Sequence, residues 1–195
     1  DHENLSDLPA DKIAPAFQRA IIANQPDKFF QILTAASKLS MTKKDIGQVF
    51  TSPISYGKTS IAVNLMHHAA RNSHMPIINS IVHHVDNPQV ALSMADSGGG
   101  NTPLHIAAYC NRSHALERFK ELGADFSIKN KSSETPHDIS KKIYGVKYLP
   151  PNYPTQKNVS LERGEAKDDA AKSIRDPAFV YSEISEKNKN FAKEK

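Results

Sequence analysis

The chain has 195 residues, of which 38% are hydrophobic and 24% are charged, so it is long enough for one folded core or for a domain with a tail. Its formal net charge of +4 is too small to indicate nucleic-acid binding. A single cysteine, Cys110, excludes an internal disulfide framework and a cysteine-based zinc cluster. No run of 18 apolar residues is present, and the polar start DHENLSDLPADK has no signal-peptide pattern. These features predict a cytoplasmic, monomeric protein without a membrane span.

The first elements along the chain are predicted to be helices. Residues 15–23 and 26–35 form a helix pair, with Phe29 and Ile32 among the expected core residues. Residues 41–50 add a short helix. This N-terminal pair, within residues 13–50, is the most divergent part of the predicted fold.

The stretch TSPISYGKTS at residues 51–60 raises the question of a nucleotide site. Gly57, Lys58 and Thr59 stand in the order found at the end of a phosphate-binding loop. The glycine required five residues earlier is replaced by Ser52, and Pro53 removes a backbone N–H donor. We therefore interpret Gly57 as a turn residue and Thr59 as a helix cap, and expect no cofactor.

The string from Asn64 to His74 predicts a helix and the polar turn after it, and a second helix follows with Ile77, Ile78, Ile81 and Val82 at core spacing. An extended connection is expected at residues 85–100.

The strongest local string is TPLHIAA at residues 102–108, and TPHDI begins 33 residues later at Thr135. Thr102 is suited to cap a helix, Pro103 suits the first helical position, and Gly123 suits a helix end. Together with the Asn64 string, this pattern resembles the ankyrin-repeat family.

The resemblance implies an all-α fold: an ankyrin-repeat solenoid of paired antiparallel helices with hairpin-like turns. The solenoid is expected to occupy residues 1–149. Its clearest repeats are at about 59–100 and 101–133, with a half-repeat cap at 134–149. Residues 150–195 are expected to form a proline-rich linker and a charged, helical or extended tail that either packs on the solenoid or stays free for a partner.

Tail residues 160–174 and 178–191 are candidates for helices. Tyr181 to Ile184 resembles a tyrosine-based recognition motif, but we favour a packing or solvated role for it.

Several residues suggest chemistry but do not complete a site. The nine histidines lack a carboxylate at ligand spacing, and His67 and His105 both match the motif histidine, which in the family is structural. Cys110 and His114 are four residues apart and could form a nucleophile–base pair if they lay on one continuous helix. The motif instead predicts that the helix breaks near Asn111. We expect no catalytic residue and no metal, and therefore no enzyme.

Proteins with this fold usually bind other proteins, so the resemblance implies a protein–protein interaction module, acting as an adaptor or scaffold through the concave face and hairpin tips. The family's contact positions, carried over to this sequence, are Arg71, Asn72, Asp96, Gly99, Asn101, Tyr109, Cys110, Lys131, Glu134 and Lys142.

Two alternatives stay open. The chain could be a secreted effector of an intracellular bacterium, acting on a host protein in the host cytosol. It could also be the targeting domain of a larger enzyme. No nucleic-acid partner is expected from either reading.

Overall fold

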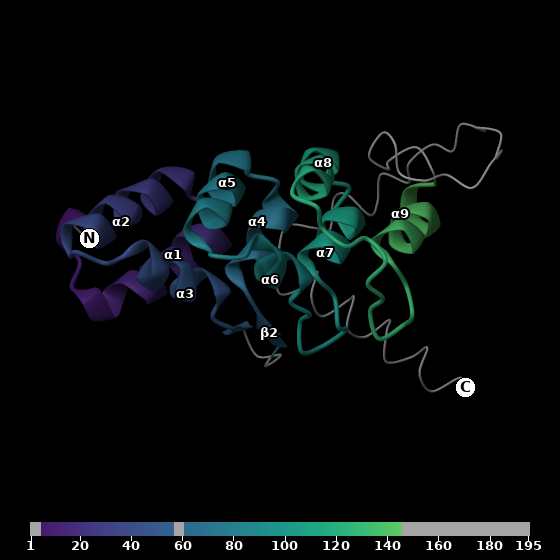
Figure 1. Cartoon of the computed structure of the whole chain (residues 1–195), viewed down its shortest axis with the longest axis horizontal. Coiled ribbons are helices and arrows are strands. Elements are labelled where there is room, and N and C mark those ends of the chain that lie inside the picture. The colour runs from purple at the N-terminus through teal and green to yellow at the C-terminus, as the bar shows by residue number, and fades with distance from the viewer. Residues whose placement is uncertain (1–4, 57–60, 146–195) are drawn as a thin grey trace.

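The computed structural model describes residues 5–56 and 61–145, and these form an elongated stack of paired helices (Figure 1). A short 3-10 helix, η1 (Leu5–Asp7), precedes the first pair. The α-helices in chain order are α1 (Ala10–Ile22), α2 (Pro26–Lys38), α3 (Lys43–Thr51), α4 (Leu65–Asn72), α5 (Met75–His84), α6 (Pro88–Ser93), α7 (Pro103–Tyr109), α8 (Ser113–Glu121) and α9 (Pro136–Tyr144).

Two rows of helices run along the stack. Helices α1, α4, α7 and α9 contact one another in that order and form the inner row, whereas α2, α5 and α8 lie beside them in the outer row (Figure 1). The loops before α7 and α9 and the β-hairpin before α4 project on the same side of the stack (Figure 1). This is the predicted solenoid of paired antiparallel helices.

The hairpin-like turn before α4 contains a short antiparallel sheet. Strands β1 (Ile54–Tyr56) and β2 (Ile61–Val63) pair with Ile54 opposite Val63. Gly57 and Thr59 lie outside the described residues. The prediction that Thr59 caps the following helix is wrong, because Asn64 is its N-cap and accepts a hydrogen bond from the His67 N–H at 3.1 Å.

The N-terminal end has a core of aromatic rings. Phe17 in α1 lies 5.2 Å from Phe29 in α2 and 5.1 Å from Phe50 in α3, between ring centroids, and all three side chains are fully buried. The predicted helices at 15–23, 26–35 and 41–50 are therefore present. However, α1 begins at Ala10 rather than Pro15, since burial of Ile13 in the same core extends the helix beyond its proline.

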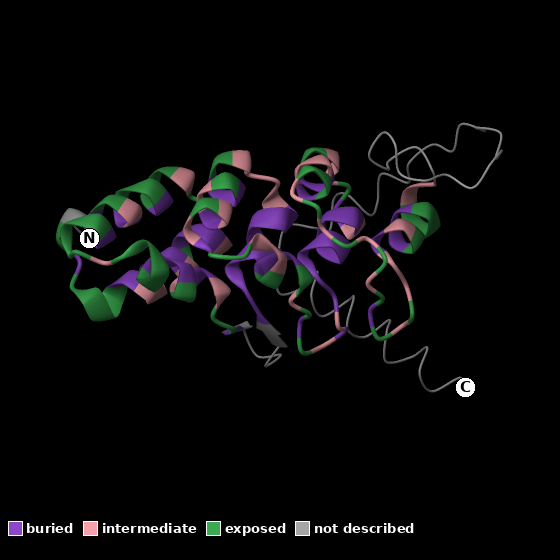
Figure 2. Ribbon diagram, viewed as in Figure 1, coloured by how far each residue is buried: buried purple, intermediate pink, exposed green. Residues whose placement is uncertain are grey.

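Small residues let neighbouring repeats approach closely. Ala69 and Ala70 of α4 and Ala107 and Ala108 of α7 are all at most 1% exposed, and they belong to one continuous core (Figure 2). Burial of this kind stabilises the stack by about 25 cal/mol per Å² of apolar surface removed from water.

The connection at residues 85–100 is not extended throughout, as the sequence suggested. It contains α6, which Asn87 caps by accepting a hydrogen bond from the Gln89 N–H at 3.0 Å. Ala91 and Leu92 of α6 join the core, and this burial explains why a helix forms there.

Helix α9 is the last described element, and its N-terminal capping box joins Thr135 to Asp138. The predicted solenoid end at residue 149 and the tail at 150–195 lie outside the described residues, so those boundaries stay predictions.

Candidate functional site

Two buried histidines hold the loops that carry the candidate binding residues. Nδ1 of His105 accepts hydrogen bonds from the backbone N–H and the hydroxyl of Thr102, at 3.1 and 2.8 Å. Its Nε2–H therefore donates to the carbonyl oxygen of Glu134, 2.9 Å away. In the preceding repeat, Nε2 of His67 lies 2.9 Å from the carbonyl oxygen of Asn101 and donates in the same way.

Each histidine thus ties a first helix to the start of the following repeat. Burial lowers the pKa of His67 to about 4 and also lowers the pKa of His105, so both rings are neutral at pH 7. This geometry agrees with the structural role expected for the motif histidine. Across residues 5–56 and 61–145, no group of three His, Cys, Asp or Glu side chains is placed to hold a metal ion.

The ten predicted contact residues differ widely in exposure. The buried residues are Arg71, Asp96, Gly99, Asn101 and Cys110; Asn72, Tyr109 and Glu134 are half-buried; Lys131 and Lys142 are exposed. Their role as contact residues stays a prediction. The half-buried and exposed side chains are accessible to a partner, whereas the buried ones act on the shape of the loops and helices.

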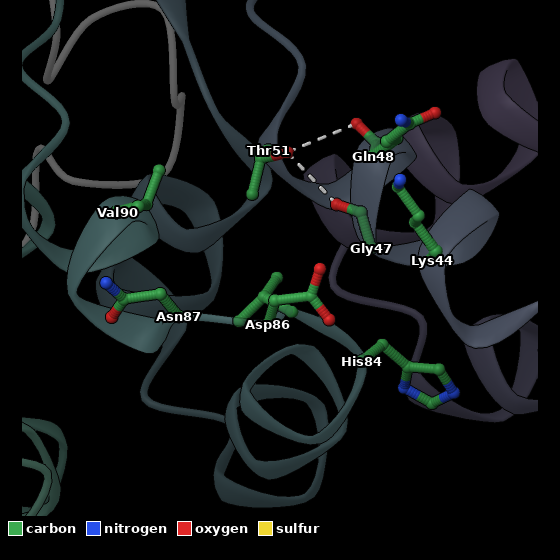
Figure 3. Close-up of a pocket in the computed structure, with 9 residues that line it drawn as sticks. Lys44, Gly47, Gln48, Thr51, His84, Asp86, Asn87 and Val90 are labelled. Carbon is green, nitrogen blue, oxygen red and sulfur yellow. Dashed lines mark hydrogen bonds between the residues drawn. The ribbon is translucent and has the colours of Figure 1, made fainter.

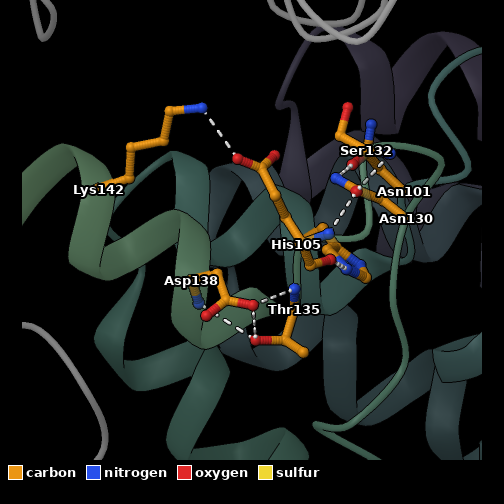
Figure 4. Close-up of polar contacts among 8 residues, drawn as sticks. Asn101, His105, Asn130, Ser132, Thr135, Asp138 and Lys142 are labelled. Carbon is orange, nitrogen blue, oxygen red and sulfur yellow. Dashed lines mark hydrogen bonds and ion pairs between the residues drawn. The ribbon is translucent and has the colours of Figure 1, made fainter. Parts of the chain in front are cut away.

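Asp96 and Asn101 shape the loop before α7. The backbone N–H of Asp96 donates to the carbonyl oxygen of Asn101 at 2.8 Å, and the Asp96 carboxylate accepts from the Gly100 N–H at 3.1 Å. The side-chain oxygen of Asn101 accepts from Asn130 at 3.0 Å, which joins this loop to the next (Figure 4). Burial raises the pKa of Asp96.

The remaining candidates are on the inner helices, and together with Ile106 we call them the inner-helix row: Arg71 and Asn72 of α4, and Ile106 and Tyr109 of α7 with its C-cap Cys110. Asn72 and Tyr109 are half-buried, whereas the other three are buried. Ile106 was not predicted. It lies three and four residues before Tyr109 and Cys110, so helical periodicity places it on the same face of α7, and that spacing is the signal that could have found it.

Hydrogen bonds across repeats fix the backbone of the inner-helix row. Nε of Arg112 donates to the carbonyl oxygen of Arg71 at 2.7 Å, and the hydroxyl of Tyr144 donates to the carbonyl oxygen of Tyr109 at 2.6 Å. These bonds cap the C-terminal ends of α4 and α7, whose last carbonyl groups have no partner within their own helix.

The loop tips form a second, more exposed group. Nζ of Lys131 donates to the carbonyl oxygens of Ser97 and Gly98, at 2.9 and 2.7 Å, and so joins the tips of consecutive loops. Lys142 of α9 pairs with the Glu134 carboxylate at 2.9 Å (Figure 4). The tips therefore present both signs of charge rather than a basic patch.

A cavity of about 240 Å³ lies away from these residues, between α3, α5 and α6 (Figure 3). Lys44, Gln48 and Thr51 of α3 line one side, and Asp86 and Val90 lie opposite. Thr51 donates its hydroxyl to the carbonyl oxygen of Gly47 at 3.1 Å. The cavity is smaller than the roughly 300–1,000 Å³ typical of small-molecule sites, and it includes none of the predicted contact residues.

Comparison with known proteins identifies the fold. Residues 66–119 match the model of a family described as ankyrin repeats (many copies), so this chain contains ankyrin repeats. The match runs from the second residue of α4 to the seventh residue of α8, and it includes every residue of the inner-helix row.

A solved structure supports the same fold over a longer part of the chain. A chain in the crystal structure of the yeast ribosomal protein Rps3 in complex with its chaperone Yar1 superposes with a TM-score of 0.54. The similarity covers 78% of this chain and 99% of that chain at 17% sequence identity, and therefore shows the fold alone. No curated protein sequence matches this chain.

No helix among the described residues is long and apolar enough to cross a membrane. The ankyrin repeats support a protein-binding module, for which the inner-helix row and the loop tips are the candidate surfaces.

Proposed function

We propose that this chain is an adaptor or scaffold that binds another protein through the inner-helix row and the adjoining loop tips. The observation that carries the proposal is that the row holds a tyrosine, Tyr109, whose side chain is half-buried and so partly accessible, together with an arginine, Arg71. Tyrosine and arginine are among the residue types that contribute most to protein–protein binding energy.

The rigidity of the row supports the same role. The hydrogen bonds from Arg112 and Tyr144 to the main chain of the row exist before any partner binds. A surface ordered in advance loses less conformational entropy on binding than a flexible one, and retains more of its contact energy as affinity.

A protein complex is also known for this fold. In the crystal structure that resembles this chain, the chaperone Yar1 is in complex with the ribosomal protein Rps3. That precedent favours a protein ligand for the present chain. It does not identify the ligand, because a sequence identity of 17% supports a shared fold and not a shared partner.

Affinity capture from cytosolic extract, read by mass spectrometry, tests the proposal. The wild-type chain is compared with a variant that carries Arg71→Gln and Tyr109→Ala. The matched control carries Lys28→Glu and Phe30→Ala on outer helix α2, where both side chains are exposed. Circular dichroism of all three chains checks that they are folded.

A protein retained by the wild type and the control but lost by the row variant supports the proposal. Equal retention by all three chains contradicts it, because the row would then not contribute to binding. Capture of no specific protein also counts against an adaptor role under those conditions.

The more specific readings of the sequence stay predictions. A bacterial effector role predicts that a translocation reporter fused to the chain reaches the host cytosol. A targeting role predicts a native product heavier than the 21.5 kDa of this chain. Cytoplasmic location is tested by fractionation.

A further inference from the structure

The cavity between α3, α5 and α6 is formed by a segment that lengthens one repeat (Figure 3). The N-cap residues Asn64 and Thr102 are 38 residues apart, whereas Thr102 and the next N-cap, Thr135, are 33 residues apart. Most of the additional residues lie between α5 and α7, in the connection that contains α6. The described repeat that follows has no helix at the corresponding place, so it lacks this wall of the cavity.

Helix α6 holds its exposed valine in a fixed position. Nε2 of Gln89 donates a hydrogen bond to the carbonyl oxygen of Leu122 at 2.7 Å, and Nδ2 of Asn64 donates to the carbonyl oxygen of Ala91 at 3.2 Å. Val90, between these two anchored residues of α6, is 50% exposed and lines the cavity. A partner that covers this side chain removes apolar surface from water without first having to order the helix.

The base of the cavity is also held in place, and it is largely apolar. A Cβ atom on Gly47 of α3 would lie 2.3 Å from the carbonyl oxygen of His84 at the end of α5, so the two helices are in close contact there. Nδ1 of His84 donates to the carbonyl oxygen of Ser80 at 2.7 Å, and Val85 beside it is buried. The base therefore suits an apolar group, and it is formed before any ligand binds.

Two opposite charges lie on different sides of the cavity. Lys44 belongs to the α3 side, and Asp86 lies opposite (Figure 3). Both side chains are exposed, and within residues 5–56 and 61–145 neither forms an ion pair. A ligand that spans the cavity therefore meets a cation on one side and an anion on the other.

Two side-chain amides add hydrogen-bonding groups on the same two sides. Oδ1 of Asn87 accepts from the Gln89 N–H at 3.0 Å, whereas its Nδ2 has no hydrogen bond to another described residue. The side-chain amide of Gln48 on α3 likewise forms none within the described part of the chain. An amide of this kind can both donate to and accept from the main chain of a bound peptide.

We propose that this cavity is a second docking site for a partner protein, and that it takes a segment in which one apolar side chain stands between an acidic and a basic residue. The apolar side chain enters between Gly47, Val85 and Val90, the carboxylate pairs with Lys44, and the cation pairs with Asp86. At about 240 Å³ the cavity is too small for a typical small-molecule site but can take the anchoring side chain of a peptide.

The apolar side chain and the two charges have different roles. Exposed ion pairs add little affinity each, so burial of the apolar group supplies most of the binding energy and the charges select the sequence of the segment. The inference rests on the proposed function for the class of ligand, a protein, but it concerns a surface separate from the inner-helix row.

Titration of the ¹⁵N-labelled full chain with the peptide acetyl-Ala-Glu-Leu-Lys-Ala-amide tests the proposal by NMR. We expect the amide signals of Gly47, Gln48, Asn87 and Val90 to shift and that of Tyr109 to stay in place, with a Kd in the millimolar range because the ligand is short. Replacing the leucine of the peptide by glycine should weaken binding by about fivefold or more, since the group that enters the cavity is lost. Absence of shifts at the cavity would overturn the proposal.

Charge reversal on each side of the cavity tests the assignment of the two ion pairs. Lys44→Glu makes both sides acidic, so this variant should prefer acetyl-Ala-Lys-Leu-Lys-Ala-amide by about threefold or more. Asp86→Lys should prefer acetyl-Ala-Glu-Leu-Glu-Ala-amide by a similar factor. The matched control is Lys43→Glu, at the adjacent exposed position of α3 that does not line the cavity, and it should keep the preference of the wild type.

The same preference in Lys44→Glu and Lys43→Glu would refute the assignment, because net charge alone would then explain the binding. Free leucine, with its own ammonium and carboxylate groups, is titrated as a further comparison. If it shifts the same amide signals as strongly as the peptide does, the cavity is a site for a small molecule and the proposal is wrong.

These titrations use no captured protein, so they separate this inference from the proposed function. If the peptides bind in the cavity with the expected charge preference but the row variant retains every captured protein, only the role of the inner-helix row fails. If the row variant loses a captured protein and the peptides do not bind, only the inference about the cavity fails.

Discussion

Nε2 of His67 donates a hydrogen bond to the carbonyl oxygen of Asn101, 34 residues later. Nδ1 of the same ring accepts a hydrogen bond from the Asn64 N–H at 3.1 Å, and this second contact requires a neutral ring. Burial lowers the pKa of His67 to about 4 in the folded chain, below the ordinary value of 6.5. Between these two values the unfolded chain binds more protons, so the free energy of unfolding must fall as the pH is lowered from about 6.5 to about 4. His68, with a pKa lowered to about 3 by burial, acts in the same direction.

Urea unfolding at a series of pH values measures this dependence. His67→Gln should flatten it between pH 6.5 and 4, whereas His83→Gln, at an exposed position, should leave it unchanged. Asp96 acts in the opposite direction, because burial raises its pKa and the folded chain then gains stability as the pH falls. The test therefore compares the pH dependence of each variant with that of the wild type, since both contain Asp96. If the free energy of unfolding of His67→Gln depends on pH as steeply as that of the wild type, the prediction is contradicted.

The capping box of α9 gives a prediction about stability. The hydroxyl of Thr135 accepts a hydrogen bond from the Asp138 N–H at 3.2 Å, while the Asp138 carboxylate accepts from the Thr135 N–H at 2.8 Å. Thr135→Ala removes the first of these bonds and also the hydrogen bond that the Thr135 hydroxyl donates to the Asp138 carboxylate at 2.8 Å. It should lower the free energy of unfolding by about 1 kcal/mol. Urea denaturation measures the change, with Lys141→Ala as the exposed control on the same helix; an effect no larger than that of the control would refute the role of the cap.

Gly47 is a helix residue at which alanine should destabilise the protein. In an ordinary helix interior, glycine to alanine stabilises by roughly 0.5–1 kcal/mol. Here, a Cβ atom on Gly47 would lie 2.3 Å from the carbonyl oxygen of His84, so α3 would have to move away from α5. Overpacking of this kind costs typically 1–3 kcal/mol.

Thermal unfolding of Gly47→Ala should therefore show a lower melting temperature than the wild type. The adjacent Gln48→Ala, at an exposed position of α3, should show little change. A melting temperature of Gly47→Ala at or above the wild-type value would mean that the two helices separate without cost.

The sequence predicted the repeats well where a local motif specifies local structure. The strings at Thr102 and Thr135 each contain a helix N-cap and, three residues later, the side chain that completes the capping box, His105 or Asp138. Both partners of each contact therefore lie within one short motif. Helix α6 was missed because its six residues contain too few apolar positions to show a period, and its formation depends on the burial of Ala91 and Leu92 by other repeats.

The candidate site was less predictable, since exposure depends on contacts between distant residues. Arg71 and Asn101 match contact positions of the family, yet both are buried in this chain. The Arg71 carbonyl oxygen is held by Arg112, 41 residues later, and the Asn101 side chain by Asn130, 29 residues later. No motif in a single sequence encodes such pairs.

Lys131 should control the order of the loop before α7. Lys131→Met keeps most of the side-chain volume but removes both hydrogen bonds from Nζ to the carbonyl oxygens of Ser97 and Gly98. Amide hydrogen exchange at residues 97–100 should become several-fold faster, because the loop opens more often once these two bonds are lost. Lys129→Met, at an exposed position of the following loop, should leave these rates unchanged; equal rates in both variants would show that the backbone alone orders the tip.

Tyr109 is the residue of the inner-helix row whose loss should most weaken a captured partner. Its side chain is half-buried while its carbonyl oxygen is held by Tyr144, so truncation removes contact surface and leaves that main-chain bond in place. Tyr109→Ala should weaken binding by more than 1 kcal/mol, about fivefold or more in Kd, measured by isothermal titration calorimetry.

Phe30→Ala is the matched control for Tyr109→Ala. It truncates an aromatic side chain that is 37% exposed on outer helix α2, away from the row, and should leave the affinity unchanged. If Tyr109→Ala binds as tightly as this control, the inner-helix row is not the binding surface. The surface around Lys131, Glu134 and Lys142 would then be the one to test, since these are the predicted contact residues outside the row with side chains at least partly exposed.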